Sequence, residues 1–100
     1  MNVNVGHNNK EIKNAIKNQL DKLTYVFPGI ASDPRGELGK KLKEIAPANM
    51  QKTFFTNGGA DAIENAIKIA RLFTGKHKII TRYRSYHGGT YGAITAGGDP

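Results

Sequence analysis

Residues 52–83 read KTFFTNGGADAIENAIKIARLFTGKHKIITRY, and this stretch decides the predicted fold. Its first six residues are rich in aromatic and β-branched types, which favours a short buried strand. Apolar and small residues then recur every three or four positions from about Ala62 to Phe73, which predicts an amphipathic helix. Gly75 is typical of a helix end, and HKIITRY, residues 77–83, is a second strand candidate. This βαβ order predicts an α/β fold with a mostly parallel sheet.

The N-terminal half of the chain predicts helices. An apolar stripe with helical spacing covers residues 12–23, and Asn8 is expected to cap that helix. Asp33 followed by Pro34 is typical of a helix start, with Asp33 as the cap and Pro34 as the first helical residue. We therefore expect two helices before the βαβ unit.

Length and composition set the broad class. With 100 residues the chain is either one small domain or part of a larger one, and we expect the second. In that interpretation residues 1–100 are a partial large domain, with a helical segment over 1–50 and strand–helix–strand over 51–100. The absence of cysteine excludes disulfides and thiol nucleophiles and fits a reducing compartment. No apolar run approaches the roughly 20 residues of a membrane span, so we expect a cytoplasmic protein without a membrane partner.

The net charge of +7 raises the question of nucleic acid. Most of the lysines fall along the predicted helices, where a solvated helix face explains them. We therefore expect no nucleic-acid partner.

Gly58, Gly59 and Ala60 join the first strand to the helix and are candidates for a phosphate-binding turn. A helix N-terminus presents unpaired N–H groups and the positive end of the helix dipole, which can hold an anion without a cationic side chain. The glycines would let the chain turn sharply and approach the bound group. The dinucleotide and P-loop signatures are both absent. A plain turn without a ligand fits these residues as well.

A second glycine-rich stretch, SYHGGT at residues 85–90, follows the second strand. It should emerge at the same sheet edge as the first, because ligands and loops gather at the carboxyl ends of parallel strands. Tyr86 would then lie beside the phosphate, so a flat heteroaromatic ligand with one phosphate would fit. His87 is a candidate base, although a hydrogen-bonded structural role also fits it. No metal site is expected.

Residues 54–93 resemble the class III aminotransferases, which are pyridoxal-phosphate enzymes of fold type I. The family's pattern here is an aromatic strand, Asn-Ser-Gly, a small residue, an acid and Ala, then a helix ending in Thr-Gly, a strand, and Tyr-His-Gly. Residues 3–23 look like the family's Gly-His segment and its following helix. The branch with taurine–pyruvate and other ω-amine aminotransferases looks most similar. The resemblance implies an N-terminal fragment of the large domain of such an enzyme.

The resemblance also implies a set of cofactor-binding residues. Gly59 and Ala60 match the pair whose backbone N–H groups hold the cofactor phosphate. Tyr86 matches the aromatic residue that stacks on the pyridine ring, and His87 follows it as in the family. Gly58 stands where many members have Ser, which removes a hydroxyl group but leaves the backbone donors. The implied cofactor is pyridoxal 5'-phosphate.

The implied activity is transfer of an amino group from an ω-amino acid or amine to a 2-oxo acid such as pyruvate or 2-oxoglutarate, by a homodimer in the parent protein. No lysine here matches the family's cofactor-attaching lysine, so the resemblance implies no catalytic residue in this chain and an inactive segment when it is alone. Glu64 matches an acid for which we expect a structural role.

Two points stay open at this level. A non-catalytic phosphate-binding or RNA-binding α/β module, using residues 58–61 and the basic and aromatic cluster at 82–86, is the alternative function. Tyr25 and Phe27 fall where the family can line the active-site entrance, but simple packing before a Pro-Gly turn also explains them.

Overall fold

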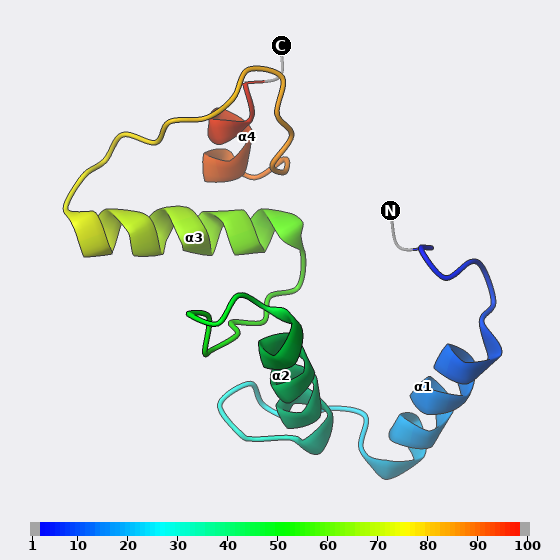
Figure 1. Cartoon of the computed structure of the whole chain (residues 1–100). Coiled ribbons are helices and arrows are strands. Elements are labelled where there is room, and N and C mark those ends of the chain that lie inside the picture. The colour runs from blue at the N-terminus through cyan, green and yellow to red at the C-terminus, as the bar shows by residue number, and fades with distance from the viewer. Residues whose placement is uncertain (1–2, 99–100) are drawn as a thin grey trace. The chain divides into compact units, whose positions relative to one another are not determined.

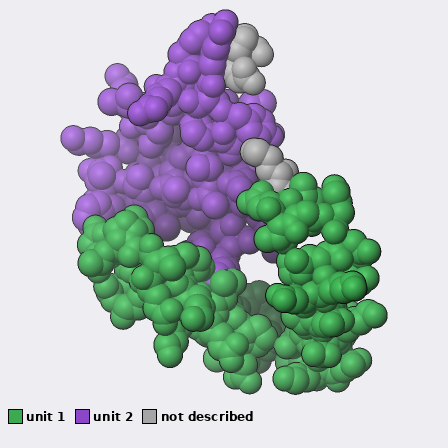
Figure 2. All heavy atoms as spheres, turned by 45° about the vertical axis from the view of Figure 1, so that its right-hand side comes forward, with its two compact units in different colours: residues 1–52 green, residues 53–100 purple. Residues whose placement is uncertain are grey.

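The computed structural model describes residues 3–98, and the chain forms four helices there (Figure 1). They are α1 (Lys10–Lys22), α2 (Asp33–Ile45), α3 (Gly59–Thr74) and α4 (Tyr91–Gly97). The chain divides into two compact units, residues 1–52 with α1 and α2, and residues 53–100 with α3 and α4 (Figure 2). Within the described residues, no helix combines the length and apolar character needed to cross a bilayer.

The first helix, α1, begins one residue later than its sequence predicts. Asn9 is the N-cap, and its side-chain oxygen accepts a hydrogen bond from the Ile12 N–H at 3.1 Å. The prediction of Asn8 as the cap is wrong, because Asn8 takes a left-handed conformation with φ of 60° and forms part of the turn before the helix. Asn tolerates this region better than most residues, so the sequence offers two adjacent cap candidates and only the backbone chooses between them.

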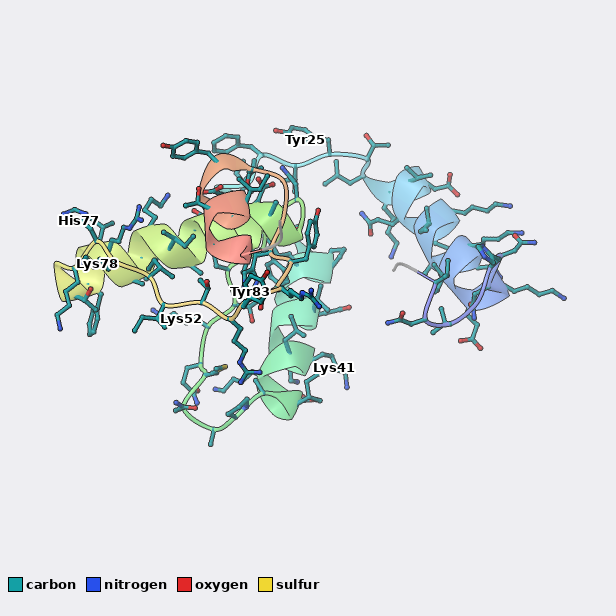
Figure 3. The ribbon with its side chains drawn as sticks, turned by 90° about the horizontal axis from the view of Figure 1, so that it is seen from above. Tyr25, Lys41, Lys52, His77, Lys78 and Tyr83 are labelled. Atoms are coloured by element: carbon teal, nitrogen blue, oxygen red, sulfur yellow. The ribbon has the colours of Figure 1, made fainter. Side chains whose placement is uncertain are left out.

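The second helix, α2, begins one residue earlier than the sequence predicts, because the N-cap is Ser32 and not Asp33. Ser32 occupies the N-cap, so Asp33 is the first helical residue and Pro34 lies in the first turn, where its missing N–H removes no helical hydrogen bond. In the turn before α2, the ring of Phe27 packs on Gly29, where an added Cβ would lie 2.7 Å from Phe27 Cε1. Tyr25 is exposed (Figure 3). Phe27 is also exposed, at 63%, so the choice between packing and an active-site entrance stays open for both aromatic residues.

The second unit is organised around α3. This helix ends at Gly75, which takes the left-handed conformation expected of a glycine just past a helix end. The chain then returns along α3, and α4 lies against the N-terminal half of α3 (Figure 1). Arg71 holds the start of the return, since its Nε donates a hydrogen bond to the carbonyl of His77 at 2.9 Å. Figure 3 shows His77 and Lys78 just beyond the C-terminal end of α3.

The two predicted strands are absent from the described part of the chain. Residues 52–57 and 77–83 have no strand conformation in residues 3–98, so the sheet of the predicted α/β fold is not confirmed. A strand is held by hydrogen bonds to a neighbouring strand, and neither segment has such a neighbour there. Their apolar side chains are correspondingly uncovered, with Phe54 70% and Ile80 98% exposed.

The described residues bury very little apolar surface. Ala93 and Ala96 of α4 are the buried apolar side chains within residues 3–98, at 0% and 8% exposure. The stripe of α1 is exposed along its whole length, as are Leu72 and Phe73 at the end of α3. The packed part of the second unit is therefore the contact between α4 and α3, which is made by small residues.

Candidate functional site

The N-terminus of α3 is an open turn with free backbone donors. Gly58 is the N-cap, and its carbonyl oxygen accepts hydrogen bonds from the Ala62 N–H at 3.1 Å and from Thr56 Oγ1 at 3.0 Å. The N–H groups of residues 59–61 have no hydrogen-bond partner within residues 3–98. Three unpaired donors and the positive end of a 16-residue helix therefore face the same point, which favours an anion there.

The surroundings of this turn leave room for a phosphate. A Cβ added at Gly58 or Gly59 would meet no atom within 4 Å, and both residues are exposed. Gly58 has extended backbone with φ of −168°, which any residue can adopt, so the expectation that these glycines permit a sharp turn is wrong. Their missing side chains keep the approach to the donors open. The turn thus fits the phosphate group of the cofactor that the sequence implies.

Gly88 brings the second glycine-rich stretch onto this turn. Its φ is 131°, and a Cβ placed there would lie 2.6 Å from Ala60 Cβ and 2.9 Å from Ala60 Cα. Such distances are too short for real Cβ contacts, so only glycine allows the backbone at this position to lie against the first turn of α3. The sequence predicts that the two glycine-rich stretches emerge at the same sheet edge. The described residues show the two stretches in contact at Gly88 and Ala60, while the sheet edge itself stays a prediction.

Tyr86 and His87 precede this contact and differ in burial. Tyr86 is 78% exposed. His87 is half-buried and lines an apolar groove of about 440 Å³ beside α3, together with side chains that include Ile63 and Ile67. Tyr86 and His87 therefore lie one or two residues before Gly88, which contacts Ala60. Stacking of Tyr86 on a ring and a role of His87 toward a cofactor stay predictions.

Glu64 links α3 to α4 through one carboxylate oxygen. Its Oε1 accepts hydrogen bonds from Thr90 Oγ1 at 2.6 Å, from the Gly92 N–H at 2.7 Å and from the Ala93 N–H at 3.0 Å. Thr90 is the N-cap of α4 but makes no capping hydrogen bond itself, so Glu64 satisfies the free N–H groups of α4 from outside that helix.

The electrostatics of this link favour the charged form of Glu64. The Thr90 hydroxyl bond first, and then the Ala93 backbone bond, lower the pKa of Glu64; burial opposes them, and the Gly92 backbone bond and the charge of Arg71 add smaller lowering effects. Gly92 leaves the necessary room, because a Cβ there would overlap the carboxylate, whose Cδ would be 3.1 Å away. The structural role expected for Glu64 is confirmed by these contacts.

Sequence reasoning missed the partners in these contacts. Gly88 belongs to the quoted Tyr-His-Gly motif, but the motif alone does not say that Ala60 is what it touches. Thr90 and Gly92 carry no signal of a partner 26 to 28 residues upstream. Among the described residues, no group of three or more His, Asp or Glu side chains is arranged to hold a metal ion.

Comparison with known proteins places the chain in a family. The Aminotransferase class-III family model matches residues 1–100. The adenosylmethionine-8-amino-7-oxononanoate aminotransferase of Staphylococcus aureus is 40% identical over 107 residues, covering 96% of this chain and 24% of the relative. An isoleucine 2-epimerase of Lentilactobacillus buchneri is 42% identical over 98 residues, covering 96% of this chain and 22% of the relative.

A solved structure agrees with the sequence relatives. The crystal structure of a thermostable (S)-enantioselective ω-transaminase from Thermomicrobium roseum has a TM-score of 0.90 and 40% identity, and covers 99% of this chain and 24% of that one. This likeness is consistent with an α/β fold of type I. The chain spans about a quarter of the length of the relatives it matches. It belongs to the class III aminotransferase family, whose members depend on pyridoxal phosphate.

Proposed function

We propose that this chain supplies the phosphate-binding turn and the ring-stacking residue of a class III aminotransferase. The observation that carries the proposal is the contact of Gly88 with Ala60, since it joins the Tyr-His-Gly stretch to three free backbone donors. The full-length protein would move an amino group from an ω-amino acid or amine to a 2-oxo acid such as pyruvate or 2-oxoglutarate. Family membership supports this reaction class.

Each proposed residue has a distinct task. The N–H groups of Gly59 and Ala60 donate hydrogen bonds to the phosphate, and Gly58 keeps their approach open. With the cofactor bound, Tyr86 would stack on the pyridine ring and shield one face from water, and His87 would support the loop that carries Tyr86. When bound, pyridoxal phosphate supplies an electron sink for negative charge that develops on the substrate. Nothing among these residues is proposed to attack the substrate, so the chain contributes binding and orientation.

The remaining parts of the proposal concern the full-length protein. We place it in the cytoplasm, which the absence of cysteine from these 100 residues supports, and we assign it a homodimeric state. The exposed apolar stripe of α1 and the exposed Leu72 and Phe73 at the end of α3 support a larger assembly, because exposed apolar surface of this extent is unfavourable in water. The amine donor and the 2-oxo acid acceptor are small molecules of the classes given above.

A reaction assay tests the proposal and distinguishes amino-group transfer from epimerisation, the activity named for the relative from Lentilactobacillus buchneri. The full-length protein is loaded with pyridoxal phosphate and given an amine donor with pyruvate or 2-oxoglutarate. We expect the visible absorbance of the bound cofactor to change on adding the donor, and a new amino acid to form from the acceptor. Racemisation of an amino acid without a new product would instead indicate an epimerase. No cofactor binding at all would refute the proposal.

The non-catalytic module that binds phosphate or RNA is not favoured. The relatives and the solved structure are named as aminotransferases or as an epimerase, and none is named as a nucleic-acid-binding protein. Within the basic cluster, the Arg84 guanidinium lies 5.7 Å from the centre of the Tyr83 ring, so that ring already has a cationic partner. Salt-dependent binding of single-stranded RNA would reverse this judgement.

A further inference from the structure

The loop at residues 86–90 is attached to α3 at two points on one helix face. Gly88 lies against Ala60, and Thr90 donates a hydrogen bond to Glu64. Ala60 and Glu64 are four residues apart, so their side chains lie one above the other on the same side of α3. Gly88 and Thr90, which follow Tyr86 closely in the chain, are therefore both attached to α3, the helix whose N-terminus would hold the cofactor phosphate.

The ring of Tyr86 has little else to hold it. It is 78% exposed and makes no hydrogen bond within residues 3–98. Packing cannot fix an exposed ring, so its position follows from the backbone that carries it. That backbone is held by Gly88 on Ala60 and, one turn further along α3, by Glu64.

We infer that Glu64 is a positioning residue, which fixes the loop of Tyr86 over the N-terminus of α3 and thereby sets how tightly the cofactor is held. This inference rests on the proposed function, because it concerns the ring that would stack on the cofactor. Glu64 itself touches neither the free donors nor Tyr86. It acts through Thr90 and through the start of α4, whose first N–H groups it satisfies.

The chemistry of the contact requires a carboxylate of this length. One oxygen accepts three donors, and a negative charge at the start of α4 complements the helix dipole. A Gln keeps an oxygen at the same reach but loses the charge. An Asp is one methylene shorter, so its oxygen would fall short of the Gly92 N–H. An Ala leaves the Gly92 and Ala93 N–H groups without this acceptor.

The test compares cofactor dissociation constants in the full-length protein, measured by titrating pyridoxal phosphate into apoprotein and following its absorbance. We expect Glu64→Ala to raise the constant about tenfold, the size of effect expected from losing an ordinary helix cap, and Glu64→Gln to raise it by about threefold or less. Glu64→Asp should resemble Glu64→Ala. The matched control is Asn65→Ala, since the Asn65 side chain bonds only to Asp61 of its own helix and should change the constant by less than about twofold.

Coupling to Tyr86 separates positioning from a general structural effect. If Glu64 acts by placing this ring, Glu64→Ala should add little in protein that already carries Tyr86→Ala, because the ring it would position is gone. Independent effects that multiply in the double variant would overturn the inference. An unchanged constant in Glu64→Ala, with Tyr86→Ala weakened, would also overturn it. If Glu64→Ala apoprotein does not fold, the same comparison is made with Glu64→Gln and Glu64→Asp.

The outcomes also distinguish this inference from the proposed function. Wild-type protein that binds no pyridoxal phosphate would refute both. Wild-type protein that binds cofactor and transfers amino groups, with Tyr86→Ala weakened and every Glu64 variant normal, would refute the inference alone. Tyr86→Ala with normal binding would remove the stacking role, and the positioning role of Glu64 would fall with it.

Discussion

Replacement of Gly88 by Ala should strongly disturb the candidate site, because the new methyl group would meet the first turn of α3. Two costs combine. The φ of 131° at Gly88 lies in a region that L residues rarely adopt, which costs about 1–3 kcal/mol. The new Cβ would also lie 2.6 Å from Ala60 Cβ and 2.9 Å from Ala60 Cα, an overpacking that costs about 1–3 kcal/mol.

The combined cost is about 2–6 kcal/mol if the loop stays in place, which is a large share of the roughly 5–15 kcal/mol that stabilises a native protein. The loop can avoid this cost by lifting off α3, and the loss then appears as weaker cofactor binding, about tenfold for each 1.4 kcal/mol. The assay therefore measures both quantities in the full-length protein. Urea unfolding of the apoprotein gives the free energy of unfolding, and cofactor titration gives the dissociation constant.

The neighbouring Gly89 is the matched control. A Cβ at Gly89 would meet no atom within 4 Å, and its φ is not in the left-handed region. Gly89→Ala should change the free energy of unfolding by no more than about 0.5 kcal/mol. If Gly88→Ala and Gly89→Ala behave alike in both measurements, the contact of Gly88 with Ala60 does not hold the loop. A second variant, Ala60→Gly combined with Gly88→Ala, should recover part of the loss because it removes the closest atom.

Three further predictions concern neighbouring positions. Gly58→Ser should be tolerated and should raise the free energy of unfolding by a few tenths of a kcal/mol, because Gly58 is an N-cap with extended backbone and open space for a side chain; a clear drop in the urea midpoint would contradict this. Gly75→Ala should lower the free energy of unfolding by about 1 kcal/mol, since φ at Gly75 is 67°, and Gly75→Asn should lower it less. Equal losses for the two variants in urea unfolding would argue against a left-handed conformation at the end of α3. The Thr90 hydroxyl lowers the pKa of Glu64 in the folded state, so the stabilisation by Glu64 is present above its ordinary pKa and is lost as pH falls through the lowered value. Unfolding midpoints followed from neutral to acidic pH should show this loss, and the Glu64→Gln protein should lack that component.

Local patterns in the sequence are enough to predict the helices. The spacing of apolar residues gives α1 and α3, and Gly75 gives the end of α3, because a helix satisfies its hydrogen bonds within itself. Element ends are less certain, as the shift of the cap from Asn8 to Asn9 shows. The strands are not confirmed in residues 3–98 for the opposite reason, since a strand over residues 77–83 needs a neighbouring strand, and no local pattern provides one.

The candidate site divides in the same way. Residues 58–60 follow from their place at the start of a helix, and the residue types of Tyr86 and His87 follow from a motif. What the sequence cannot give is the contact that joins them. The contact of Gly88 with Ala60 and the hydrogen bond from Thr90 to Glu64 are tertiary, and the second joins residues 26 positions apart in the chain.

The way the second unit is packed determines where it should be sensitive to substitution. Within residues 3–98 its buried apolar side chains are alanines of α4, so the contact between α3 and α4 has no fully buried large apolar group whose burial could compensate for a lost hydrogen bond. The hydrogen-bonded carboxylate of Glu64 and the backbone of Gly88 therefore give this contact the specificity that a larger core would give elsewhere. Substitutions at Glu64 and Gly88 should then affect cofactor binding more than substitutions of exposed large residues on α3 such as Leu72, which is 80% exposed.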